Sequence, residues 1–257
     1  MNPAARPIIL TYHSVHDCDS PLCVPPRVFA EQMQWLKGHA QVLPLATVGE
    51  LLAKRRAFPE RAVALTFDDG FQDFYEQAAP VLAKHELPAT VFLPTGWCGR
   101  DNAWPGQPAW VAPQPLMDWP RISELSAQGI DFGGHSVSHP SLTDVPGPQV
   151  EQEVADCKRV IEQHTGKPVQ FFCYPYGKWN DSVRRVVKQH YAGACSTAAG
   201  VLEVTSDVYS MPRVDAHYVR NPSWFRSMFT RRFLTYIAAR RVVRRLRRQP
   251  EGYLSRG

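Results

Sequence analysis

Seven short apolar runs that alternate with helical segments restrict most strongly how this chain can fold. Their lengths and β-branched content predict strands at residues 8–12, 62–67, 89–93, 130–133, 169–174, 192–196 and 209–214. Helical periodicity and start signals predict helices at 27–39, 47–55, 71–85, 120–128, 149–164 and 181–190. Strands that alternate with helices predict an α/β fold, built as a parallel sheet or a barrel.

Polar side chains stand where several of these predicted strands end. His13 follows the first strand, Asp68 and Asp69 follow the second, and His135 follows the fourth. Arg213 lies at the end of the last strand. In a parallel barrel all these positions share the C-terminal rim, where active sites are built. The order of elements therefore predicts that these residues converge.

The segment GGHSVSHPSL places two histidines, His135 and His139, four residues apart. An isolated pair of this kind is more often two unrelated histidines, but a pair of carboxylates is predicted on the same rim. Two imidazoles and one carboxylate form a set that binds a divalent metal and leaves positions open for water. Of Asp68 and Asp69, one could then bind the metal and the other accept a proton from the water.

Three motifs resemble a known family when they are taken together and in order. They are TFDDG (66–70), HSVSH (135–139) and FCYPYG (172–177), and ILTYHSV (9–15) and PATVFLPTG (88–96) are similar to the same family. The chain resembles the polysaccharide deacetylases, that is, the chitooligosaccharide-deacetylase (NodB) homology domain of carbohydrate esterase family 4, over about residues 8–217. This resemblance implies a distorted (β/α) barrel of about seven parallel strands, in agreement with the strands predicted above.

The resemblance also implies a role for each matching residue. The metal ligands, usually of Zn²⁺, would be Asp69, His135 and His139. Asp68 would be the general base for the attacking water. The backbone N–H of Tyr176 would stabilise the oxyanion, and Tyr174 and Pro175 would belong to the same substrate-binding region.

The chain departs from the family pattern at two positions. Many members carry an arginine two residues before the proline of the third motif, and this chain has Cys173 there. Arg213 is the candidate substitute, although an ion pair with Asp215 would give it a purely structural role. The family's late Leu-x-His motif is also missing. The chain resembles a family subgroup that has an early Tyr-His segment and takes its general acid from the first strand, which makes His13 the first candidate for this role and His217 the second.

These residues together predict a metal-dependent hydrolase that removes N-acetyl groups from an amino-sugar glycan or a lipid-linked precursor, in exopolysaccharide or envelope biosynthesis. One alternative is an amidase or deformylase that acts on a small substrate, and another is a non-catalytic carbohydrate-binding relative. Trp97, Trp104 and Trp110 lie in an irregular segment, 96–115, where they could stack on sugar units or simply pack the loop down.

The C-terminal segment differs in charge from the rest of the chain. From Asn221 onward there are ten arginines and one glutamate, a balance of +9 within a net charge of +5, so the preceding residues carry about −4. We therefore divide the chain into a catalytic domain, 1–220, and an Arg-rich helical tail, 221–257. Residues 224–249 form either a solvated terminal helix or an interfacial helix for peripheral membrane association. Nucleic acid is not an expected partner, because no nucleic-acid motif accompanies the tail.

The six cysteines occur without a CxxC pair, and the N-terminus has no signal-peptide pattern. We therefore predict reduced thiols, with Cys173 and Cys195 in the core and away from the metal ligands. The same observations predict a cytoplasmic location, at the inner face of the membrane if the tail binds lipid.

Overall fold

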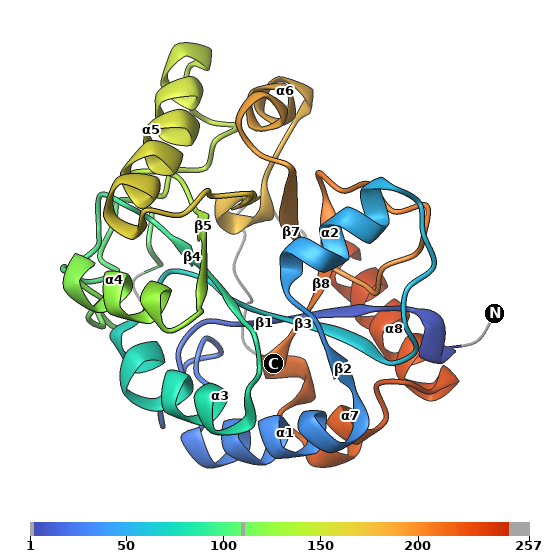
Figure 1. Cartoon of the computed structure of the whole chain (residues 1–257). Helices are drawn as coiled ribbons and strands as arrows, with labels where there is room; N and C mark the ends of the chain where they lie inside the picture. Colours follow the sequence, from blue (N-terminus) through green and yellow to red (C-terminus); the bar gives the residue numbers. More distant parts are fainter. Residues whose placement is uncertain (1–2, 109–110, 247–257) are drawn as a thin grey trace.

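The computed structural model describes residues 3–108 and 111–246, which form a closed barrel of seven parallel strands (Figure 1). The ring runs in the order β1, β8, β7, β6, β5, β4, β3 and closes because β1 pairs with β3. Its strands are β1 (Ile8–Tyr12), β3 (Ala62–Phe67), β4 (Thr90–Leu93), β5 (Asp131–Gly134), β6 (Phe171–Cys173), β7 (Gly193–Ala199) and β8 (Met211–Asp215). The predicted (β/α) barrel of about seven strands is confirmed.

Helices surround the barrel and connect most of its consecutive strands (Figure 1). They are α1 (Pro26–His39), α2 (Leu45–Ala53), α3 (Ala79–His85), α4 (Trp119–Ala127), α5 (Gly147–Thr165) and α6 (Asp181–His190). A two-residue strand, β2 (Gln41–Val42), pairs with the start of β3 outside the ring. The barrel is distorted at its β5–β6 seam, where Gly134 and Phe172 are the one paired position recorded in the described chain.

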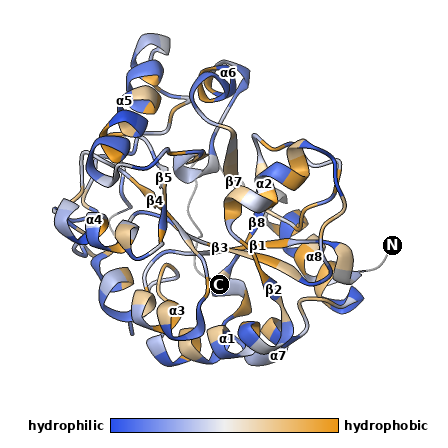
Figure 2. Cartoon of the chain, in the orientation of Figure 1, coloured by the Kyte–Doolittle hydropathy of each residue, from blue (hydrophilic) through white to orange (hydrophobic). Residues whose placement is uncertain are grey.

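The strands form because nearly all their side chains are removed from water. All five residues of β1 and all six of β3 are buried, as expected for parallel strands packed on both faces. Hydrophobic residues accordingly follow these strands at the centre of the molecule (Figure 2). Space is so limited here that a Cβ on Gly133 would lie 2.5 Å from the ring of Phe92.

The predicted helix at 71–85 is not a continuous α-helix. It contains a π-helical turn, Phe74–Ala78, which α3 continues from Ala79. Single π turns inside helices are frequent at functional sites. This turn begins directly after Asp73, whose side chain contacts the segment that follows β1.

The last part of the described chain packs onto the barrel. Helix α7 (Pro222–Arg226), helix α8 (Arg231–Leu246) and the turn between them bury Phe225, Met228, Phe233 and Ile237 in the main hydrophobic core. These apolar side chains of the predicted tail are therefore covered by the barrel, whereas residues 247–257 lie outside the described part. No helix in residues 3–108 and 111–246 is both long and apolar enough to cross a membrane.

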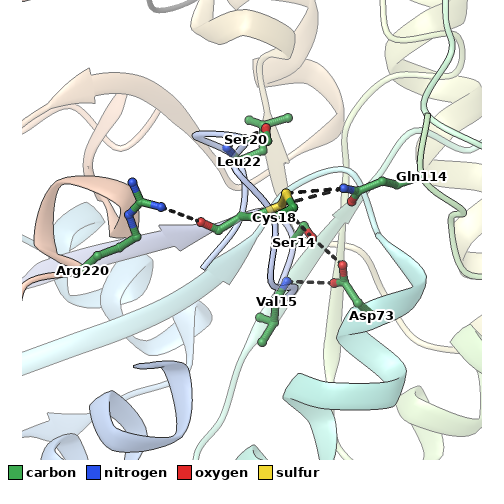
Figure 3. The surroundings of a disulfide bond; sticks show 9 residues. Ser14, Val15, Cys18, Ser20, Leu22, Asp73, Gln114 and Arg220 are labelled. Atoms are coloured by element: carbon green, nitrogen blue, oxygen red, sulfur yellow. Dashed lines mark hydrogen bonds between the residues drawn. A yellow bond between two sulfur atoms is a disulfide. The ribbon is translucent and has the colours of Figure 1, made fainter. Parts of the chain in front are cut away.

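The prediction that all six cysteines are reduced is wrong for two of them. Cys18 and Cys23 form a disulfide in the loop after β1, whereas the other four are free thiols (Figure 3). A turn in which the Cys23 N–H bonds to the Ser20 carbonyl helps to bring the two Cα atoms to 5.9 Å. Disulfides form mainly in oxidising compartments. The pairing removes one of the two observations behind the cytoplasmic location, which stays an untested prediction.

Removal of this disulfide is expected to destabilise the protein moderately. The cysteines are five positions apart, and closing so short a loop contributes roughly 2 kcal/mol in the chain-entropy account. The Cys18→Ser/Cys23→Ser variant should therefore unfold roughly 5 °C below the unmodified protein. Thermal unfolding with and without a reductant measures this. The reductant should lower the Tm of the unmodified protein and leave that of the variant unchanged; an unchanged Tm in both would contradict the prediction.

Candidate active site

Asp68 is held at the end of β3 by a buried arginine from β8. The Arg213 guanidinium donates two parallel hydrogen bonds, from Nη1 to Oδ1 (2.7 Å) and from Nη2 to Oδ2 (2.6 Å). The Arg213 side chain is 1 % exposed, and its Nε donates to the carbonyl of Ser196. Asp215, the alternative partner, instead accepts from the His217 N–H. The structure thus pairs Arg213 with Asp68 and not with Asp215.

The Asp68–Arg213 pair also fixes the charge of the carboxylate. Burial alone would raise the pKa of Asp68, but the charge and hydrogen bonds of Arg213 hold it well below its ordinary value. Cys173 lies against both, with its Sγ 3.7 Å from Asp68 Oδ2 and 3.1 Å from Arg213 Nη2. Burial raises the pKa of this thiol to about 11, so it is neutral. The prediction that Cys173 lies away from the site is wrong, whereas Cys195 is a buried free thiol.

Asp69, His135 and His139 converge beside Asp68. Asp69 Oδ1 lies 3.4 Å from His135 Nε2 and 3.5 Å from His139 Nε2, and the two Nε2 atoms are 3.2 Å apart. Ligands at about 2.0–2.2 Å from one tetrahedral metal are separated by about 3.3–3.6 Å. The three atoms therefore form one face of a coordination polyhedron of that size. The oxygen and nitrogen donors also suit a divalent transition metal.

The electrostatics of these three residues favour a positive charge among them. Burial lowers the pKa of His139, and repulsion from His135 adds to this, which brings it to about 3. His139 is therefore a neutral imidazole with a lone pair to donate. Burial opposes protonation of His135 as well, yet Cys173 and Asp69 raise its pKa overall. His135 Nδ1 contacts the Cys173 carbonyl at 2.7 Å, an outer contact that fixes the orientation of a ligating imidazole.

The backbone around the site adopts conformations that side chains rarely favour. Among the described residues other than glycine, seven have positive φ, and four of them belong to the three motifs. They are Asp69 (71°), Ser136 (67°), His139 (59°) and Tyr176 (57°). Left-handed backbone of this kind costs free energy and persists where surrounding contacts impose it, often at functional sites. The residues with left-handed backbone therefore lie in the same loops as the three motifs.

Glu153 on α5 imposes the shape of the loop that carries His139. Its buried carboxylate accepts hydrogen bonds from the N–H groups of Val137 and Ser138, both at 2.8 Å, and from the Ser138 hydroxyl. The sequence prediction missed this residue, because a glutamate inside an amphipathic helix most often faces solvent. Its one signal was its place on the buried stripe, beside Val150 and Val154.

Replacing Glu153 with glutamine should weaken metal binding by about 10–100-fold, as removal of outer contacts typically does. The amide oxygen can take the place of Oε2, which accepts from both N–H groups, but its NH2 group then replaces Oε1, the acceptor of the Ser138 hydroxyl bond. The negative charge that strengthens all three hydrogen bonds is also lost, so the loop is expected to loosen. Competition with a chromogenic chelator measures the affinity. Asp156→Asn is the matched control, since Asp156 lies one turn further along α5 and pairs with Arg159 at the surface. Equal affinities for both variants would exclude the proposed tether.

His13 is the one of the two general-acid candidates that contacts Asp68 in the described structure. Its Nε2 lies 3.8 Å from Asp68 Oδ2, and its side chain is 12 % exposed. The next two residues are fixed by Asp73, which accepts from the Ser14 hydroxyl (2.5 Å) and the Val15 N–H (2.9 Å; Figure 3). His217 is half-buried next to Arg220 and the Pro21 carbonyl. Asp73 thus fixes the segment that carries His13. The disulfide loop also holds this segment, because the Ser14 N–H donates to the Leu22 carbonyl.

The tryptophan-rich segment packs over the candidate metal ligands. The Trp104 ring is 2 % exposed and lies 4.2 Å from the His139 ring, which also lies 4.8 Å from the Tyr176 ring. Trp97 donates from its indole to the Ser138 carbonyl. Trp104 therefore forms a wall of the site and offers no exposed surface for stacking on sugar, whereas Trp110 lies outside the described residues.

The structure places the third motif beside the same ligands, with one correction. Tyr176 contacts His139 and is half-buried, and Pro175 is buried before it. The Tyr174 side chain, in contrast, is fully buried, and its hydroxyl donates to the Tyr209 carbonyl. It therefore supports the loop from the core and does not face a substrate.

Comparison with known proteins identifies the group to which this site belongs. The sequence profile described as polysaccharide deacetylase matches residues 55–193, more than half of the chain. The chain belongs to the polysaccharide deacetylase family. It is a hydrolase that removes N-acetyl groups from carbohydrate. His13 and Arg213 lie outside the matched residues, so in this deacetylase their assignment rests on the contacts described above.

Individual proteins similar to this chain are also named as deacetylases. The deacetylase is 27% identical to the Bacillus subtilis protein YxkH, over 82% of this chain and 71% of that protein. It is 28% identical to the poly-β-1,6-N-acetyl-D-glucosamine N-deacetylase of Staphylococcus epidermidis, over 74% of this chain and 67% of that enzyme. Among solved structures, the Streptococcus pyogenes deacetylase PplD, in complex with acetate, matches with a TM-score of 0.72 and 25% identity, over 82% of this chain and 92% of that chain.

Proposed function

We propose that this deacetylase is a metal-dependent enzyme that removes acetyl groups from a polymer of N-acetylglucosamine during exopolysaccharide or envelope biosynthesis. The observation that carries the proposal is the placement of a three-residue ligand face, Asp69, His135 and His139, directly beside the arginine-held carboxylate of Asp68. The similarity to an enzyme named for poly-β-1,6-N-acetyl-D-glucosamine supports this choice of substrate.

The ligand set suits Zn²⁺, which would supply a more acidic water and an electrophile for the acyl oxygen. Asp68 then accepts the proton of the attacking water. Its pKa lies below the ordinary range, so it is ionised throughout the neutral range, and an acidified water requires only a weak base. Arg213 keeps both carboxylate oxygens oriented while the proton moves.

Two further groups complete the chemistry. His13 lies against Asp68 and donates a proton to the amine nitrogen as the C–N bond breaks, which releases acetate and a free amino sugar. The backbone N–H of Tyr176 donates to the developing oxyanion, a role that fixed backbone donors fill well. The turn at Tyr176 is fixed by its neighbours: Gly177 also has positive φ, and the Thr197 hydroxyl donates to the Tyr176 carbonyl.

The proposal is tested by acetate release from N-acetylglucosamine oligomers with β-1,4 and β-1,6 linkages, using zinc-reconstituted protein. Release should increase with oligomer length, and the Asp68→Asn variant should release none above background. Release from the monosaccharide alone would instead favour a small-substrate amidase. A failure to release acetate from every oligomer would refute the proposed substrate.

Replacing His13 with glutamine should reduce amide hydrolysis by about 10²–10⁴-fold, the range for loss of a general acid. An aryl acetate has a leaving group that departs without protonation, so the variant should hydrolyse it almost as fast as the unmodified enzyme. His217→Asn is the control and should retain amide hydrolysis. If His13→Gln loses both activities equally, His13 has another role; if His217→Asn shows the selective loss, the acid is His217.

A further inference from the structure

The surface formed by α7 and α8 carries positive charge without counter-charge. Residues 216–246 contain eight arginines and no aspartate, glutamate or lysine. Six of these arginines have described side chains, and none of the six forms an ion pair within the described part of the chain. They are Arg220, Arg226, Arg231, Arg232, Arg240 and Arg241. Such a surface attracts an anionic partner.

Helix α8 packs beside the barrel (Figure 1), and contacts near its two ends show which way it runs. Just before the helix, the ring of Phe229 lies 5.9 Å from the guanidinium of Arg61, which precedes β3. Near its other end, Arg240 lies 4.7 Å over the ring of Tyr218, three residues after β8 ends at the rim. The end of α8 therefore emerges on the same face as Asp68 and Arg213.

At this end the helix exposes apolar side chains next to its arginines. Val242 and Val243 are 54% and 39% exposed and follow the exposed Arg241. Val204 is the one other large hydrophobic residue exposed to this degree in the described chain. Neighbouring Arg220 donates to the Cys23 carbonyl of the disulfide loop (Figure 3). We call Arg220, Arg240, Arg241, Val242 and Val243 the rim patch.

We propose that the rim patch docks the enzyme end-on to a membrane surface of anionic phospholipid, with the catalytic face toward the bilayer. Arginines attract the headgroups, and the exposed valines gain burial at the headgroup boundary. Neither a soluble glycan nor nucleic acid would provide an apolar surface for these valines. The apolar stripe of α8 is buried against the barrel, so the helix does not lie flat in the interface as an amphipathic helix does.

If the enzyme docks end-on, the arginines at the two ends of α8 contribute unequally to membrane binding. Arg241 belongs to the rim patch, whereas Arg231 is ten residues away, about 15 Å along the axis. This exceeds the distance of about 8–10 Å over which salt screens a charge. Neutralising Arg241 should therefore weaken binding about fivefold, and neutralising Arg231 less than twofold.

The test is flotation of the purified full chain with vesicles of phosphatidylglycerol and phosphatidylcholine, or of phosphatidylcholine alone. Binding is expected with the anionic vesicles, and 0.5 M salt should remove most of it. Arg241→Gln and Val242→Ser should each weaken it, whereas Arg231→Gln and Val204→Ser serve as matched controls. All variants should deacetylate a soluble oligomer normally.

Three results would each overturn the proposal. Equal binding to neutral vesicles would remove the electrostatic attraction. Equal losses for Arg231→Gln and Arg241→Gln would exclude end-on docking. Binding to a DNA oligonucleotide without binding to anionic vesicles would make nucleic acid the partner.

Discussion

Asp68→Asn is expected to retain the metal and to lose turnover by about 10²–10⁴-fold, the contribution of a positioned general base. The amide has nearly the shape of the carboxylate but cannot accept a proton from water. It can accept one hydrogen bond from Arg213 in place of the two at 2.7 and 2.6 Å. Steady-state acetate release and metal content, measured on the same preparation, report the two effects separately.

Replacement of the neighbouring carboxylate, Asp69, should affect metal binding instead of proton transfer. Asp69 Oδ1 is one corner of the ligand face, so Asp69→Asn should lose metal during dialysis, and turnover should be lost with it. Excess metal should partly restore Asp69→Asn but not Asp68→Asn. Normal turnover in both variants, or restoration of both by metal, would show that the two aspartates do not divide the roles as proposed.

Much of the barrel could be predicted from the sequence, because its strands are continuous apolar runs and polar residues begin where they end. The structure confirms β1 and β3 with the predicted bounds. Closure of the sheet then brings Asp68, His135 and Arg213 to one rim, as the strand order implied. The candidate site was predictable to this extent because the topology alone creates it.

What could not be predicted depends on the paths of the loops. The Cys18–Cys23 bond requires a turn that residue spacing does not specify, and Trp104 reaches His139 from a segment without periodicity. Glu153 is hidden for a different reason. Its role depends on two N–H groups of a loop in left-handed conformation, which no side-chain pattern reveals.

Replacing Arg213 with methionine should be the most destabilising single change discussed here, at about 3–5 kcal/mol, because it leaves the carboxylate of Asp68 buried without the guanidinium that pairs with it. This corresponds to a Tm lower by roughly 10 °C. Arg213→Lys should cost less, since the charge stays while the paired geometry and the bond to the Ser196 carbonyl are lost. Urea unfolding of the metal-free proteins measures both changes.

The stability lost in Arg213→Met should depend on pH in a defined direction. In the unmodified protein the pKa of Asp68 is lowered, so the pair stabilises fully above the ordinary aspartate value near 4 and its contribution is lost as the pH falls through the folded value. In Arg213→Met burial raises the pKa of Asp68 instead, so folding favours the protonated acid and the variant is penalised as pH rises. The stability difference should therefore be full at pH 6–8 and should shrink below about pH 4. A difference that does not change with pH would mean that Arg213 stabilises the barrel by packing and not through the charge of Asp68.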